Sequence, residues 1–124
     1  MKLENEKNKN TFVYALRGIK KAVKSEKNVK FDLLAACAVI ICGIVLKINI
    51  IEWITCLTLI GVVISAELIN TAIETTIDMF TREKNDYAEK AKDVAAGAVL
   101  TIAFISAVIG GIIFIPKIIY VINR

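Results

Sequence analysis

The chain has 124 residues and forms at most one domain, and 56% of its residues are apolar, above the roughly 45–50% found in soluble globular domains. The net charge of +4 follows from basic residues placed around the apolar runs and suits anionic lipid head groups, so it gives no reason to infer binding of nucleic acid. Cys37, Cys42 and Cys56 lie within apolar runs without metal-ligand spacing, which indicates packing residues.

The N-terminal segment changes character at residue 12. Residues 1–11 are polar and charged, and we expect them to be flexible. From residue 12 onward, apolar residues recur at spacings of four, three and four, which predicts an amphipathic helix over 12–30 that lies on the inner membrane surface. The apolar positions are Phe12, Leu16, Ile19 and Val23, and the basic residues at other positions of the segment are Arg17, Lys20, Lys21, Lys24 and Lys27. This helix is either a simple anchor or also one wall of a site.

Three apolar runs follow, over 31–51, 53–77 and 94–115. A helix that spans a membrane needs about 20 mostly apolar residues, and each run is of that length or slightly longer. The first two runs are separated by a very short polar turn, which predicts an antiparallel hairpin. Pro116 is expected to mark the outer end of the third span. The sequence therefore predicts an all-α integral membrane protein, a single domain over 1–124 with one surface helix and three transmembrane helices.

Basic residues give the predicted orientation in the membrane. Nine Lys and Arg lie in residues 1–30 and four lie between the second and third runs, against only Lys47, Lys117 and Arg124 elsewhere. Because basic residues favour the cytoplasmic side, the N-terminus and the second connection are expected there, and the C-terminus outside. Residues 1–30 have no apolar core or small-residue cleavage site, so we expect no secretory signal among them. We expect a multi-pass protein of the inner (plasma) membrane.

The second run carries a polar stripe at its cytoplasmic end. Glu67, Asn70, Glu74 and Asp78 occupy positions i, i+3, i+7 and i+11, which share one helical face. Glu67 lies roughly 16 Å along the axis from Asp78, below the membrane interface. A central Asp costs about 2.5–3.5 kcal/mol on insertion scales, so such carboxylates need protein, metal or water around them. Three interpretations are open: helix-to-helix hydrogen bonding, an ion or proton path, and a catalytic or metal site.

Two more polar clusters are predicted to reach the same leaflet. They are Ser25-Glu26-Lys27-Asn28, before the first span, and Lys90-Ala91-Lys92-Asp93, before the third. Each alone is typical of a charged helix end at the head groups. Together with the stripe they offer oxygen ligands for Mg²⁺, a cation for phosphates and a carboxylate base, the groups that phosphoryl transfer needs. The sequence has no Walker A loop, GxGxxG, His, HRD or DFG element, which excludes the soluble kinase and ATPase folds.

Two segments carry a resemblance to a known family. ELINTAIETTID at 67–78 and AKDVAAGAVL at 91–100 resemble the prokaryotic diacylglycerol kinase and undecaprenol kinase family of small trimeric membrane enzymes, and the likeness covers nearly the whole chain. The resemblance implies a homotrimer that transfers phosphate from Mg-ATP to a lipid alcohol. The SEKN and AKDVAAGAVL segments look like the Gram-positive undecaprenol kinase branch, so undecaprenol is the expected substrate and diacylglycerol the alternative. A non-enzymatic three-span ion-conducting or adaptor protein is the alternative of another class.

The resemblance also implies roles for individual residues. Glu67 would be the base that takes the proton from the lipid hydroxyl and so contacts the lipid. Glu26 and Glu74 would hold Mg²⁺ together with the ATP phosphates. Lys92 and Asp93 would bind the nucleotide. The remaining implied residues are Asn70 and Asp78, which would orient neighbours, Lys7, Tyr14, Glu83 and Asn85, which would contact ATP, and Ala96, which would contact the lipid.

Overall fold

The structure is a computed structural model that describes the backbone of residues 2–124 and the side chains of residues 11–124. Over this range the chain forms helices and no strand, as the sequence predicts. The helices are α1 (Lys2–Ser25), α2 (Lys27–Val45), α3 (Ile50–Phe80) and α4 (Asp86–Ile122). The last three are long and apolar enough to cross a membrane, which confirms the predicted number of spans.

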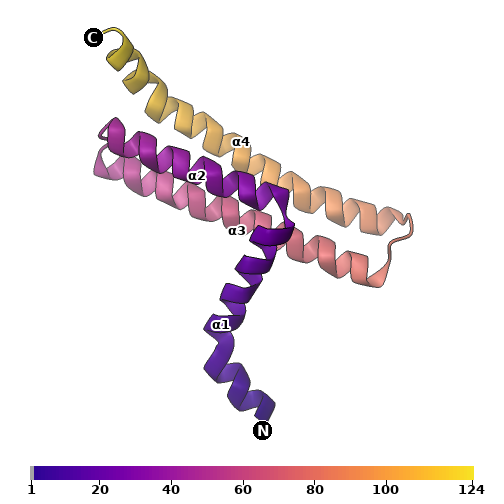
Figure 1. The fold of residues 1–124 in the computed structure, drawn as a ribbon. Helices are drawn as coiled ribbons and strands as arrows, with labels where there is room; N and C mark the ends of the chain where they lie inside the picture. Colours follow the sequence, from indigo (N-terminus) through magenta and orange to yellow (C-terminus); the bar gives the residue numbers. More distant parts are fainter. Residues whose placement is uncertain (1) are drawn as a thin grey trace.

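Helix α3 is the centre of the bundle. Helices α2 and α4 each pack against α3, but the backbones of α2 and α4 do not approach one another along the described chain. Figure 1 shows these three helices side by side and α1 projecting away from them at an angle. At about 1.5 Å per residue, the 31 residues of α3 and the 19 of α2 span roughly 46 and 28 Å. The end of α3 therefore extends well beyond the start of α2.

The first helix differs from its predicted bounds at both ends. It begins at Lys2, so the helix includes the segment that we expected to be flexible, since Lys and Glu favour helix intrinsically. It ends at Ser25, five residues before the predicted limit of 30, because Glu26 adopts an extended conformation with φ −105° and ψ 116°. This single residue turns the chain from α1 into α2.

The α2–α3 hairpin is closed by a capping box. The Oδ1 atom of Asn49 accepts a hydrogen bond from the backbone N–H of Glu52 at 2.9 Å, and Oε2 of Glu52 accepts one from the N–H of Asn49 at 3.0 Å. These bonds satisfy backbone donors that the start of a helix leaves free. Lys117 of α4 pairs with Glu52 at 3.2 Å, which joins α4 to the same end of the bundle.

Pro116 does not end the fourth helix. Helix α4 continues through it to Ile122. A proline inside a helix removes one backbone hydrogen bond, and transmembrane helices tolerate this loss where local adjustments satisfy the freed carbonyl. The predicted outer end of the membrane span at this residue stays a prediction, because a helix can extend past the bilayer.

The surface of the bundle is apolar. Many large hydrophobic side chains are exposed, among them Leu34 at 71%, Leu100 at 71% and Phe104 at 68%. The buried cluster is small and comprises Ile48, Cys56 and Ile113. An apolar surface of this extent suits lipid tails as solvent and not water. The packing role predicted for the cysteines fits Cys56, which is buried, whereas Cys37 and Cys42 are exposed along α2.

Gly43 allows the hairpin helices to approach closely, and its replacement tests this packing. A Cβ atom at Gly43 would lie 2.8 Å from Cη2 of Trp53, whereas one at Gly18 would meet nothing within 4 Å. We predict that Gly43→Ala destabilises the protein by about 1–3 kcal/mol, the usual cost of overpacking. Gly18→Ala should be neutral or stabilising, because alanine favours helix. Thermal unfolding in detergent measures both, and equal stability of the two variants would contradict this packing.

Candidate active site

The buried polar residues lie on α3 where α1 and α2 meet it. Among the described side chains, Glu67 and Asn70 are the polar groups classed as buried, with 3% and 7% of their surface exposed. Both α1 and α2 contact α3, and Val29 in the first turn of α2 is 1% exposed. The start of α2 therefore covers this part of the polar stripe. A carboxylate that is so enclosed requires hydrogen-bonding or charged partners nearby.

Glu67 is surrounded by polar residues from two helices. The side chain of Asn28, in the first turn of α2, lies close enough to interact with the Glu67 carboxyl group, and so do the carboxyl groups of Asp32, Glu74 and Glu26. Three of the residues predicted for the site, Glu26, Glu67 and Glu74, are thus brought together within one chain. Asn28 supplies a neutral donor in a group that otherwise consists of acids.

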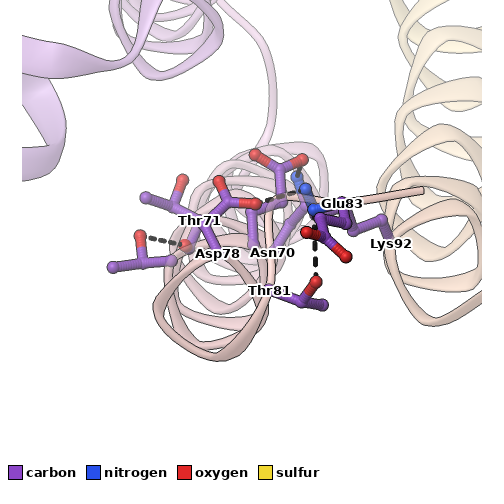
Figure 2. Close-up of polar contacts among 8 residues, drawn as sticks. Asn70, Thr71, Asp78, Thr81, Glu83 and Lys92 are labelled. Carbon is purple, nitrogen blue, oxygen red and sulfur yellow. Dashed lines mark hydrogen bonds and ion pairs between the residues drawn. The ribbon is translucent and has the colours of Figure 1, made fainter. Parts of the chain in front are cut away.

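Glu74 is held by Asn70. The Nδ2 atom of Asn70 donates a hydrogen bond to Oε1 of Glu74 at 3.1 Å, and Figure 2 shows Asn70 among the polar contacts of this region. The two residues are four positions apart, so they are neighbours on the helix surface. The Oδ1 atom of Asn70 is buried and has no hydrogen-bond partner among the described residues. One acceptor beside Glu74 is therefore available to a ligand.

Lys92 pairs with Asp78 and not with Glu67. The ion pair joins the last turns of α3 to the first turns of α4, and Figure 2 shows the two side chains in contact. Asp78 lies eleven residues beyond Glu67, roughly 16 Å along the axis. Within one chain the lysine is thus held toward the helix ends, away from the buried carboxylate. Asp93 and Ala96, further along α4, are exposed.

The residues implied in adenosine binding are not brought together in one chain. Tyr14 lies on α1 under the guanidinium group of Arg17, which is 5.7 Å from the ring centroid. Glu83 and Asn85 lie in the α3–α4 connection, and Figure 1 shows this connection beyond the start of α2, apart from α1. Asn85 caps α4, because its Oδ1 atom accepts hydrogen bonds from the N–H groups of Tyr87 and Ala88. The side chain of Lys7 lies outside the described residues.

The carboxylates near Glu67 suit the binding of a metal ion together with a nucleotide better than the binding of a metal ion alone. In the described part of the chain, no group of three or more His, Cys, Asp or Glu side chains is close enough to hold a metal ion. Mg²⁺ is usually bound by one or two carboxylates together with substrate phosphates. Glu26 makes no capping hydrogen bond, and Glu74 is positioned by Asn70. Two carboxylates are therefore available for a cation that arrives with phosphate.

Sequence reasoning missed two residues of this site. Asn28 and Asp32 are spaced four apart and so share one face of α2, the face that meets Glu67. The sequence did contain a signal for a role of these two residues in the site. Asp32 is the acidic residue within the apolar run 31–51, and Asn28 belongs to the polar cluster before that run. The contact between α2 and α3 was needed to bring them to Glu67.

Comparison with known proteins gives consistent matches over most of the chain. The family model described as prokaryotic diacylglycerol kinase matches residues 13–114. Undecaprenol kinase of Bacillus subtilis (strain 168) is 50% identical over 107 residues, which cover 86% of this chain and 87% of that protein. Diacylglycerol kinase of Haemophilus influenzae is 31% identical over 106 residues, 85% of this chain and 90% of that protein. Diacylglycerol kinase of Synechocystis sp. is 31% identical over 107 residues, 86% of this chain and 61% of that protein.

Proposed function

The chain belongs to the prokaryotic diacylglycerol kinase family and is a lipid kinase, and on that premise we propose that it phosphorylates undecaprenol. The reaction transfers the γ-phosphate of ATP to the primary hydroxyl and gives undecaprenyl phosphate and ADP. The observation that carries the substrate is the 50% identity to an undecaprenol kinase, against 31% to each of two diacylglycerol kinases. Those two relatives make diacylglycerol the second candidate.

Glu67 is the proposed base. The residue is 3% exposed, and the Asn28 side chain lies close to its carboxyl group, so the carboxyl group is kept away from bulk water. As the lipid oxygen forms a bond to the γ-phosphorus, the bond from that phosphorus to the oxygen of ADP breaks, and the hydroxyl proton passes to Glu67. The geometry supports this role because Glu67 lies deepest along the polar stripe, where a lipid hydroxyl arrives.

Glu26 and Glu74 are the proposed ligands of Mg²⁺. When bound, Mg²⁺ neutralises charge on the phosphates. Glu26 sits at the turn between α1 and α2, and Asn70 orients Glu74 from the same helix. In this proposal Asp78 positions Lys92, which contacts the phosphates together with Asp93.

A homotrimer would complete the nucleotide site. Helix α1 and the α3–α4 connection lie apart in one chain, yet the family resemblance gives adenosine contacts to both, through Lys7, Tyr14, Glu83 and Asn85. Sites shared between subunits would bring the two segments together, with Ala96 at the lipid entrance. A shallow hollow on α3 lined by Thr58, Gly61 and Ser65 supports subunit packing, because small residues allow close helix contact in membranes.

The proposed location is the plasma membrane with the site on the cytoplasmic side. ATP is a cytoplasmic substrate, and the basic residues concentrate in 1–30 and in 82–92, beside the candidate site. By the positive-inside rule these segments face the cytoplasm, which places the N-terminus inside and the C-terminus outside.

A direct assay separates the two candidate substrates. We predict that the purified protein in detergent micelles with Mg-ATP releases ADP in a lipid-dependent manner, with a higher kcat/KM for undecaprenol than for diacylglycerol. A preference for diacylglycerol would overturn the proposed substrate. Absence of turnover with both alcohols would favour the ion-conducting or adaptor alternative.

Two substitutions separate the base from the metal ligand. Glu67→Gln keeps the size of the side chain but removes the base, so kcat should fall by roughly 10²–10⁴-fold with little change in nucleotide affinity. Glu74→Gln should weaken Mg²⁺-dependent ATP binding together with turnover. Binding of Mg-ATP, measured by calorimetry on each variant, distinguishes the two effects, and an exchange of the two phenotypes would show that the assigned roles are reversed.

A further inference from the structure

Two ion pairs join α3 to α4, one near each end of the helix pair. The outer ion pair joins Glu52, at the start of α3, to Lys117 of α4 at 3.2 Å. The inner ion pair joins Asp78, near the end of α3, to Lys92 of α4. In the described part of the chain no other hydrogen bond or ion pair links side chains of these two helices, whose hydroxyl groups bond to carbonyl groups of their own helix.

The two ion pairs are separated by nearly the same interval on both helices. Asp78 follows Glu52 by 26 residues on α3, and Lys117 follows Lys92 by 25 residues on α4. At about 1.5 Å per residue, each interval spans roughly 38 Å, between the roughly 30 Å of the hydrocarbon core and the 40–45 Å of the whole bilayer. A shift of α4 by one helical turn, about 5.4 Å, would separate the charged groups of both pairs. The two pairs therefore form together in one alignment of α4 along α3.

The apolar contacts between the two ion pairs select this alignment only weakly. The buried residues of α4 are Ala95 and Ile113, and each lies within about one turn of a lysine that forms an ion pair. Apolar side chains in lipid have no hydrophobic drive to associate, so one set of apolar contacts can replace another at small cost. Ion pairs with side-chain exposures of 30% and 21%, as found at Lys117 and Glu52, add little stability. Their main expected effect is to choose the alignment.

The outer ion pair also connects α4 to the turn between α2 and α3. The Oε2 atom of Glu52 accepts a hydrogen bond from the backbone N–H of Asn49 at 3.0 Å and also pairs with Nζ of Lys117. Pro116 lies next to this lysine within α4 and has no backbone N–H to donate. The last turns of α4 are thus held by this side-chain contact as well as by the helix backbone.

We propose that Glu52 and Lys117 are positioning residues for the phosphate-binding end of α4. Their ion pair sets the alignment of α4 along α3 and thereby the position of Lys92 and Asp93, because the residues of one helix move together along its axis. Without the outer pair, α4 adopts several alignments, and the affinity for Mg-ATP falls with the fraction that is competent to bind it. This inference rests on the proposed function, since it takes Lys92 and Asp93 as contacts of the phosphates.

Removal of the outer charge tests the inference. Lys117→Met keeps an unbranched side chain and leaves the capping box intact. The Kd for Mg-ATP, measured by calorimetry, and the KM for ATP should both rise roughly three- to tenfold, whereas the KM for the lipid alcohol should not change. Lys117→Arg retains the charge and should retain the wild-type constants. Lys47→Met is the matched control and should have no effect, because this lysine of the α2–α3 connection is exposed and forms no ion pair within the described residues.

A change on the other side of the ion pair provides a second test. Glu52→Gln removes the carboxylate charge and retains an acceptor for the N–H of Asn49. Because either substitution removes the same interaction, the double variant Glu52→Gln/Lys117→Met should have the Kd for Mg-ATP of Lys117→Met alone. Independent roles of the two residues would instead multiply the two effects.

Unchanged constants for ATP in Lys117→Met would overturn the inference, and so would an equal rise in Lys117→Arg or Lys47→Met. A lower melting temperature of Lys117→Met with unchanged constants for ATP would also contradict it, because a smaller folded fraction alters neither constant. If Lys117→Met does not fold, Glu52→Gln is judged by the same criteria. Wild-type protein that binds Mg-ATP but phosphorylates neither alcohol would refute the proposed function alone, since calorimetry still tests the positioning role.

Discussion

The structure depends on one constraint: a membrane-spanning helix carries a buried carboxylate, which needs polar partners around it. Glu67 is 3% exposed, and an isolated charge at this depth is costly. The start of α2 meets that constraint, because it brings the Asn28 amide to the carboxyl group. The extended conformation of Glu26 ends α1 at the point where α2 must begin to reach α3. The break between the first two helices is therefore part of the site.

Because α3 is longer than α2, its polar stripe extends from a region covered by α2 to a region beyond it. Helix α3 runs past the start of α2 (Figure 1), so its polar stripe passes from Glu67, near the first turn of α2, to Asp78, beside Lys92. Glu74 lies between them with its side chain fixed by Asn70. In the proposed function, a lipid alcohol enters at one end of this stripe and a nucleotide at the other. The two substrates differ in solubility, and in this proposal they meet along the axis of α3.

The sequence predicted what local periodicity determines. Three apolar runs predicted the spanning helices, and the spacing of Glu67, Asn70 and Glu74 placed them on one face. The predicted topology also placed Glu26 near these three residues, although the roles of all four residues stay predictions. The match to the family could be anticipated from the segments 67–78 and 91–100 alone.

Features that depend on tertiary packing could not be predicted. Neither glycine nor proline marks the break at Glu26, so the amphipathic pattern alone placed the helix end at residue 30. Asn28 and Asp32 acquire significance only because α2 packs on α3. The continuation of α4 through Pro116 could not be predicted either, because the sequence does not show how neighbouring groups satisfy a freed carbonyl; the outer end of the span at this residue stays a prediction.

Access to the stripe from one side of the membrane is the most direct test of this account. Thr71 lies one residue from Asn70, and its hydroxyl bonds only to the backbone carbonyl of Glu67, so Thr71→Cys changes little else once Cys37, Cys42 and Cys56 are replaced by serine. In vesicles of known orientation, a membrane-impermeant thiol reagent should label this cysteine from the cytoplasmic side alone, and Mg-ATP should slow the labelling. Labelling from the outer side, or labelling that Mg-ATP leaves unchanged, would contradict a site in which the acidic stripe faces the nucleotide.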